Sequence, residues 1–115
     1  MKPDNLCKIK NIFKKIYKFE NNLQKKFNLS INEILTICSL SNLKMSSTEL
    51  ATEIGVSPSR MSRILKKLES KNYIKRTLSK NDKRKMMFNL TEKGKEKVRT
   101  VHDTDINIPK INTKK

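Results

Sequence analysis

Hydrophobic residues recur every three or four positions in the first part of the chain, a pattern that predicts amphipathic helices. The first helix is predicted from about residue 5 to 27, with lysines on its other faces. The second spans about 31–41 and begins at a capping-box sequence, Ser30 to Glu33. The side chains that we expect the second helix to bury are Ile34, Leu35, Ile37, Cys38 and Leu40.

A short third helix is predicted after a connection, residues 43–45, that can form a minor edge strand. Ser46 and Glu49 again have the spacing of a capping box, in which each residue bonds to the backbone of the other. The side chains expected to face inward are Leu50, Ala51 and Ile54.

A tight turn separates this helix from a fourth. Gly55 stands where the third helix must stop, because glycine readily adopts the left-handed conformation that follows a helix. Ser57 is suited to the N-cap of the next helix and Pro58 to its first position, where a missing N–H costs nothing. The resulting helix, residues 58–71, completes a helix-turn-helix pattern.

The fourth helix has two chemically different faces. Helical spacing places Met61, Ile64, Leu65 and Leu68 inward. Opposite them lie Ser59, Arg63, Lys66 and Ser70, flanked by Arg60, Ser62 and Lys67. Such a face suits the major groove of DNA, which admits one α-helix and whose guanine edges an arginine reads through two hydrogen bonds. The alternative is a merely solvated basic face.

A β-hairpin and a last helix are predicted beyond residue 71. Segments 73–78 and 86–90 are rich in β-branched, aromatic and long apolar residues, and the polar residues 79–85 separate them. We call the hairpin the wing and residues 79–85 its tip. Thr91 begins a helix that ends near residue 105. The predicted fold class is mainly α, an α+β winged helix.

The charge of the chain supports a nucleic-acid partner. Its 115 residues include 27 basic and 11 acidic ones, a net charge of +16. Residues 57–85 carry +9 of it, 11 basic minus 2 acidic, and hold four of the five arginines. A codon bias toward lysine raises the lysine count without explaining the clustering. A localised basic surface is typical of DNA binding.

Other classes of function find little support. Cys7 and Cys38 have no disulfide or metal-ligand spacing, even together with His102. The sequence contains no phosphate-binding loop and no nucleophile elbow, so we predict neither an enzyme nor a metal or cofactor. No apolar run approaches the roughly 18–20 residues that span a bilayer, and nothing resembles a secretory leader. We therefore expect a cytoplasmic protein without a membrane partner.

A set of residues spread over about positions 29–97 forms a recognisable pattern. The set consists of Leu50-Ala51, Ile54-Gly55-Val56-Ser57-Pro58-Ser59, Ser62-Arg63, Leu65, Leu68-Glu69, Ile74-Lys75-Arg76, Asp82-Lys83-Arg84 and Leu90-Thr91-Glu92-Lys93-Gly94. With it this region resembles the MarR-type (multiple-antibiotic-resistance regulator) winged-helix repressors, and the Asp-x-Arg of the wing is the most specific part of the resemblance. The family usually has Gly-Leu after its DNA-reading helix, where this chain has Asn72-Tyr73, and asparagine also tolerates a positive φ.

The resemblance implies roles for particular residues. In that family the acidic residue of the wing motif braces the wing and the arginine contacts DNA, so Asp82 and Arg84 take these roles here. Members that sense peroxide carry a reactive cysteine near the N-terminus, which makes Cys7 a candidate redox sensor. The alternative for Cys7 is a small, partly buried side chain beside the apolar stripe.

The resemblance also implies an assembly. Such proteins dimerise through their first helix and two long C-terminal helices, and an effector pocket lies where these meet the DNA-binding lobe. From this sequence we expect a short last helix and no sixth helix. We expect a homodimer through the first helix and residues 98–111, which include Ile106, Ile108 and Ile111. A small-molecule effector is less expected than in the family at large.

These observations predict sequence-specific binding of double-stranded DNA by a homodimeric transcription regulator, a repressor. The predicted domains are a dimerisation helix (1–28), a winged helix-turn-helix (29–91), and a short C-terminal helix and tail (92–115). The recognition helix, 58–71, enters the major groove and the wing tip the minor groove. The alternative is a non-specific architectural or accessory DNA-binding protein. The predicted DNA-binding residues are Ser57, Ser59, Arg60, Ser62, Arg63, Lys66, Lys67, Arg76, Lys80, Lys83, Arg84 and Lys85. For Arg76, a phosphate contact and a structural ion pair are both open.

Overall fold

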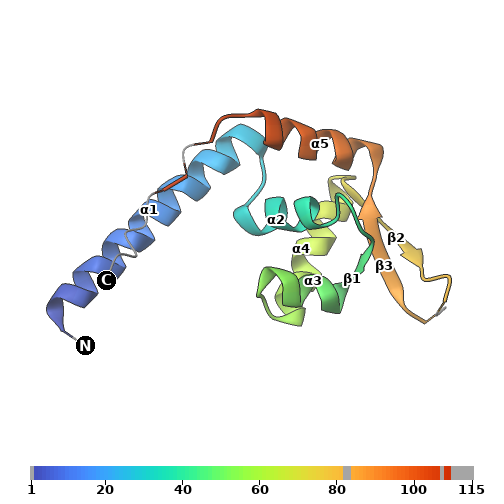
Figure 1. Cartoon of the computed structure of the whole chain (residues 1–115), viewed down its shortest axis with the longest axis horizontal. Coiled ribbons are helices and arrows are strands. Elements are labelled where there is room, and N and C mark those ends of the chain that lie inside the picture. Colours follow the sequence, from blue (N-terminus) through green and yellow to red (C-terminus); the bar gives the residue numbers. More distant parts are fainter. Residues whose placement is uncertain (1, 82–83, 107, 110–115) are drawn as a thin grey trace. The chain divides into compact units, whose positions relative to one another are not determined.

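The computed structural model describes residues 2–81, 84–106 and 108–109. Two compact units make up the chain, one formed by Met1–Ser30 with Asp105–Lys115 and the other by Ile31–Thr104. Figure 1 shows the elements in chain order. They are α1 (Pro3–Phe27), α2 (Ile31–Ser39), β1 (Met45–Ser46), α3 (Ser47–Ile54), α4 (Pro58–Ser70), β2 (Ile74–Leu78), β3 (Met86–Leu90) and α5 (Glu92–Asp103). The predicted fold class, mainly α with a small sheet, is confirmed.

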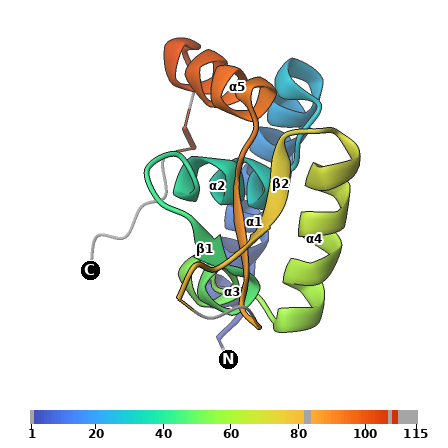
Figure 2. The same ribbon diagram turned by 90° about the vertical axis from the view of Figure 1, so that its right-hand side faces the viewer.

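The larger unit combines four helices with a three-stranded antiparallel sheet. The strand order is β1-β3-β2, so the predicted edge strand exists, and Met45 lies opposite Phe88. In the wing, Ile74 lies opposite Leu90 and Leu78 opposite Met86. Helix α4 packs against α2, α3 and β2, and α5 packs against α2 and β3 (Figure 2). The predicted winged helix-turn-helix arrangement is therefore present.

The core of this unit is apolar and draws on every helix from α2 to α5. The four residues of α4 predicted to face inward are all buried. Their burial forces the opposite side of α4 outward, because a helix has one inward stripe. The other buried apolar residues of the unit are Ile34, Ile37, Leu40, Leu50, Ala51, Ile74, Phe88, Leu90, Val98 and Val101.

The helix ends follow the local signals in the sequence. Ser46 and Glu49 form the predicted capping box, with both reciprocal hydrogen bonds present. Gly55 has φ +83° and Asn72 has φ +65°, so both adopt the left-handed conformation expected of them. Thr91 caps α5 by accepting a hydrogen bond from the Gly94 N–H.

One expectation about α2 is wrong. Leu35 is 46% exposed, Cys38 is only half-buried, and the buried stripe instead includes Glu33 and Thr36. Both polar side chains have partners there: the Thr36 hydroxyl donates to the Asn32 carbonyl, and the Glu33 carboxylate accepts from Lys71. Polar groups whose hydrogen bonds are satisfied can occupy inward positions, so the buried face of α2 differs from the purely apolar stripe that we expected.

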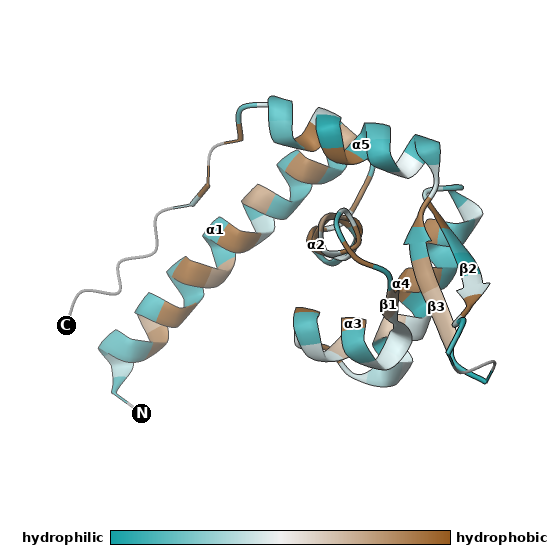
Figure 3. Ribbon diagram, turned by 45° about the vertical axis from the view of Figure 1, so that its right-hand side comes forward, coloured by the Kyte–Doolittle hydropathy of each residue, from teal (hydrophilic) through white to brown (hydrophobic). Residues whose placement is uncertain are grey.

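The smaller unit is dominated by α1, which has the predicted amphipathic pattern. Leu23 and Phe27 are buried, and the helix ends at Phe27, followed by its C-cap residue Asn28 with φ +55°. Within this unit Lys26 Nζ donates to the Asp105 carbonyl at 3.2 Å. Hydrophobic and hydrophilic residues alternate along α1 (Figure 3). In the described part of the chain no helix is long and apolar enough to cross a membrane.

Candidate nucleic-acid interface

The outward face of α4 carries the side chains that the sequence assigned to it. Met61, Ile64, Leu65 and Leu68 occupy the buried face. Six polar and basic residues on the other sides of the helix are all exposed: Ser59, Arg60, Ser62, Arg63, Lys66 and Lys67. Two guanidinium forks, two ammonium groups and small hydroxyl residues on one helix can contact base edges and phosphates at close range.

The first turn of α4 is held by Ser57. Its Oγ accepts a hydrogen bond from the Arg60 N–H at 3.2 Å, and it lies 3.4 Å from the Ser59 Oγ. Pro58 follows at the first helical position, as predicted. Ser57 thus has a capping role, and its exposed hydroxyl lies beside the residues that would contact DNA.

The turn between α3 and α4 is fixed by backbone hydrogen bonds. The N–H groups of Gly55 and Val56 both donate to the Ala51 carbonyl, at 2.9 and 3.0 Å. Two donors on one carbonyl close the end of α3 and set the direction in which the chain leaves it. Because α3 also packs on α4, α4 is supported on its buried side and its basic face is left exposed.

The wing supplies further basic residues. The Ser79 N–H donates to the Lys85 carbonyl at 2.9 Å, which extends the strand pairing to the tip. Lys80, Arg84 and Lys85 are exposed, as the sequence analysis required. Asp82 and Lys83 lie outside the described residues, so the bracing role of Asp82 and the DNA contact of Lys83 stay predictions.

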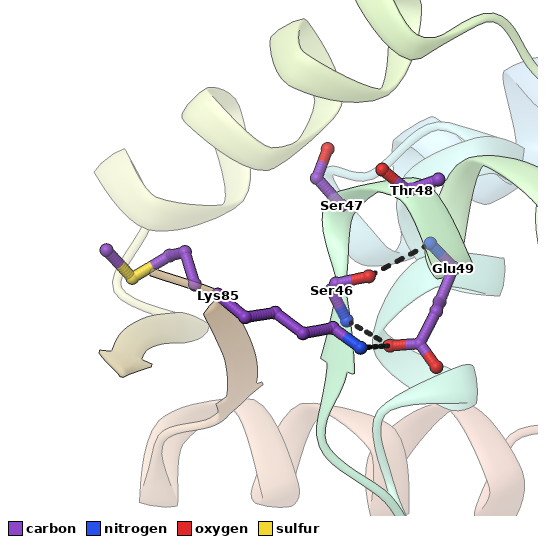
Figure 4. Close-up of a pocket in the computed structure, with 6 residues that line it drawn as sticks. Ser46, Ser47, Thr48, Glu49 and Lys85 are labelled. Carbon is purple, nitrogen blue, oxygen red and sulfur yellow. Dashed lines mark hydrogen bonds and ion pairs between the residues drawn. The ribbon is translucent and has the colours of Figure 1, made fainter. Parts of the chain in front are cut away.

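Lys85 contacts the start of α3, and Figure 4 shows the arrangement. Its Nζ lies 3.6 Å from Glu49 Oε1, the oxygen that also accepts the Ser46 N–H at 2.9 Å. The hydrogen bonds from Ser46, together with the positive charge of Lys85, lower the pKa of the Glu49 carboxyl. This pair joins the wing to the capping box of α3, and the sequence analysis missed it.

Arg76 forms a structural ion pair, one of the two alternatives left open for it. Its Nε and Nη2 donate to the two carboxylate oxygens of Glu69, each at 2.8 Å. The guanidinium also lies 5.5 Å from the centroid of the Phe88 ring. The hydrogen bonds and charge of Glu69 raise the pKa of Arg76 further. A phosphate contact by Arg76 stays a prediction, and two nitrogens of its guanidinium are already bound to Glu69.

A second ion pair also lies at the C-terminal end of α4. Glu33 is buried, and its Oε2 accepts from Lys71 Nζ at 3.2 Å. Lys71 directly follows α4, so the pair joins the end of that helix to α2. Glu33 was predicted only as a capping residue. Its position four residues before Ile37, on the same helical stripe, was the signal that it faces inward.

The remaining candidate residues lie apart from this surface. Cys7 is exposed on α1, and Cys38 is half-buried on α2, where burial raises the pKa of its thiol. A raised pKa lowers the fraction of thiolate, the reactive form of a cysteine, at Cys38. Among the described residues, no three histidine, cysteine or acidic side chains gather closely enough to hold a metal ion.

The fold and this basic surface define a winged helix-turn-helix protein. The chain belongs to the MarR family, whose model matches residues 28–86. It is 30% identical over 83 residues to the HTH-type transcriptional regulator SarZ of Staphylococcus aureus, a match that covers 71% of this chain and 56% of SarZ. The chain thus spans about half the length of the curated relatives it matches. These relatives are regulators, in agreement with the prediction that the chain is not an enzyme.

Solved structures of regulators share the fold. The transcriptional regulator BldR of Sulfolobus solfataricus is 26% identical with a TM-score of 0.72, covering 90% of this chain and 78% of BldR. AbsC of Streptomyces coelicolor, a MarR family regulator, is 27% identical with a TM-score of 0.74, covering 89% of this chain and 73% of AbsC. A mutant MarR of E. coli, solved in complex with operator DNA, is 23% identical with a TM-score of 0.73, covering 82% of this chain and 68% of MarR.

Proposed function

We propose that this chain is a DNA-binding transcription regulator that acts as a homodimer and represses its target genes. The observation that carries the proposal is the exposed basic face of α4, held by Ser57 at one end and by the Glu33–Lys71 ion pair at the other. The similarity of this chain to MarR of E. coli, a mutant of which has been solved with operator DNA, supports the same function.

In this proposal some side chains of the basic surface read the base sequence and others bind the DNA backbone. Arg60 and Arg63, with Ser59, read base edges in the major groove. Arg84 lies in the minor groove, whose negative potential attracts a guanidinium. The lysines neutralise phosphates and supply most of the affinity. They are Lys66, Lys67, Lys80, Lys83 and Lys85.

An Arg63→Ala variant tests the base-reading role. Binding to a duplex selected for affinity should weaken by about 1–3 kcal/mol, whereas binding to random duplex should change much less. Lys67→Ala is the matched control on the same helix, because loss of a phosphate contact weakens both duplexes alike. Equal losses on both duplexes for Arg63→Ala would exclude base reading by this residue.

The homodimer is proposed through α1. Four large apolar side chains on one stripe of this helix are exposed, and the rings of Phe13 and Tyr17 stack with centroids 6.1 Å apart. An apolar stripe of this kind is costly in water and is covered when two copies associate. Its members are Leu6, Ile9, Phe13 and Tyr17.

Sedimentation of the whole chain tests the dimer. Phe13→Glu places a charge in the centre of the stripe and should convert a dimer to a monomer over the micromolar range. Lys14→Glu, a neighbouring substitution off the stripe, is the control. A wild-type chain that sediments as a monomer would remove the dimer from the proposal and leave DNA binding to be tested by itself.

Repression is tested by expression of a reporter gene placed behind a binding site for the protein. Reporter output should fall when the wild-type chain is present and recover with Arg63→Ala, because a bound dimer blocks the promoter. An increase in output with the wild-type chain would assign the opposite sign of regulation.

The alternative is a non-specific architectural protein, and the net charge of +16 is the observation that favours it. Competition between selected and random duplexes separates the two functions. A regulator should prefer its site by roughly a thousandfold or more at physiological salt. A preference below about tenfold, together with a steep salt dependence, would support the architectural function instead.

A further inference from the structure

Two exposed apolar side chains lie opposite each other near the tip of the wing. Leu78, at the end of β2, is 58% exposed, and Met86, at the start of β3, is 38% exposed. The two residues are register partners in the hairpin. Two large apolar side chains exposed next to each other, beside a basic tip, indicate a site where another molecule binds.

The geometry of the hairpin brings these side chains together. Paired residues of an antiparallel ladder point to the same face, so Leu78 and Met86 share one face with the buried pair Ile74 and Leu90. Ser79 and Lys85 form the next pair toward the tip. The hydrogen bond from the Ser79 N–H to the Lys85 carbonyl makes them a hydrogen-bonded pair. Leu78 and Met86 are then a non-hydrogen-bonded pair, the kind in which side chains lie closest.

Met86 also lines a groove between α4 and the wing. The floor of this groove is apolar, and its edges carry cations. Arg76, which lines the groove, is paired with Glu69, and Lys85, which precedes Met86, is paired with Glu49. Lys66 has no acidic partner among the described residues. The lining residues include Ser62, Leu65, Lys66, Arg76, Met86 and Phe88.

We propose that Leu78 and Met86 pack against deoxyribose rings of the DNA strand that runs between α4 and the wing. This proposal rests on the proposed function, because it assigns a contact within the same DNA-binding surface. A DNA strand carries apolar sugar edges next to anionic phosphates. In this groove apolar Met86 and cationic Lys66 line the same surface, so a sugar and its phosphate can be contacted together. An apolar protein surface would instead leave Lys66 without a counter-charge.

Substitution by threonine tests the contact, because threonine keeps a strong preference for strands while removing most of the apolar surface. Leu78→Thr and Met86→Thr should each weaken binding to a random-sequence duplex by about tenfold. The slope of log affinity against log salt should stay the same, because no phosphate contact is lost. Lys66→Ala should lower both the affinity and this slope.

Two further variants separate the contact from general effects. Leu43→Thr changes a leucine that is even more exposed, at 65%, in the connection between α2 and β1, and should leave DNA binding unchanged. Leu78→Met keeps the apolar surface and should retain wild-type affinity. Unfolding followed by circular dichroism verifies that all variants are folded.

Several results would overturn the proposal. One is unchanged DNA affinity in both threonine variants. This includes the case in which the variants change only the sedimentation of the chain, so that the apolar pair mediates self-association and not DNA binding. Another is a loss of affinity that is accompanied by a smaller salt slope. A wild-type chain that binds no duplex would remove the proposed function itself, and this contact with it.

Discussion

The carboxylate of Glu69 accepts two parallel hydrogen bonds from the guanidinium of Arg76, which joins the last turn of α4 to the first strand of the wing. The pair of Lys85 with Glu49 joins the other arm of the wing to the start of α3. Each arm of the hairpin is therefore tied to a different helix of the helix-turn-helix. Both ties come from acidic residues that sequence reasoning did not assign to the site.

Arg76→Ala should change stability more than DNA binding. Its side chain is 48% exposed and the Glu69 side chain 27%, so solvent screens the pair, and its loss should cost only about 0.5–1 kcal/mol of unfolding free energy. Denaturant unfolding measures this cost. The salt slope of DNA binding should not change, and a slope lower by about 1 would instead assign Arg76 to a phosphate.

The capping carboxylate of Glu49 should make stability depend on acid pH. Its pKa is lowered in the folded chain, first by the hydrogen bonds from Ser46 and then by Lys85. A lowered pKa stabilises the fold above the unfolded-state pKa of about 4.3, and this contribution is lost as the pH falls through the folded value. Thermal unfolding of wild type and Glu49→Gln should therefore differ at neutral pH and converge in acid. A constant difference at all pH values would contradict this assignment.

The buried ion pair of Glu33 and Lys71 should respond unequally to removal of its two partners. The Glu33 side chain is 5% exposed and the Lys71 side chain 30%. Lys71→Met leaves a buried carboxylate without its lysine and should cost about 2–3 kcal/mol, whereas Glu33→Gln leaves a lysine that can reach water and should cost less. Unfolding free energies measure both, with Lys67→Met as an exposed control. Equal costs would contradict the burial argument.

Gly94 should not tolerate alanine, although it lies in α5. A Cβ at this position would overlap the carbonyl oxygen of Tyr73, which accepts the Thr91 N–H at 3.1 Å. Helix propensity favours alanine by about 1 kcal/mol, but the overlap forces the start of α5 away from the wing and should cost about 1–3 kcal/mol. Thermal unfolding tests the sign, and Arg99→Ala on the exposed side of α5 should be neutral. A stabilised Gly94→Ala variant would contradict this prediction, because the Tyr73 carbonyl would then have moved aside at little cost.

Local signals were enough to predict most elements of the larger unit. Gly55, Ser57 and Pro58 lie where backbone conformation limits the choice of residue, so the turn and the start of α4 could be read directly. The two faces of α4 followed from helical spacing, since all four inward residues are apolar and contiguous along one stripe. Leu35 was misplaced because spacing alone does not show that Glu33 and Thr36 find partners inside.

The sequence alone therefore specified which side chains lie on α4 and in the wing, because caps, turns and periodicity act over a few residues. The partners of Glu33, Glu49 and Glu69 lie 38, 36 and 7 positions away, and only the packing of helices and strands brought them together. A carboxylate's partner depends on which surfaces meet in space. For that reason the basic character of the surface was predictable, while the ion pairs that hold it in position were not.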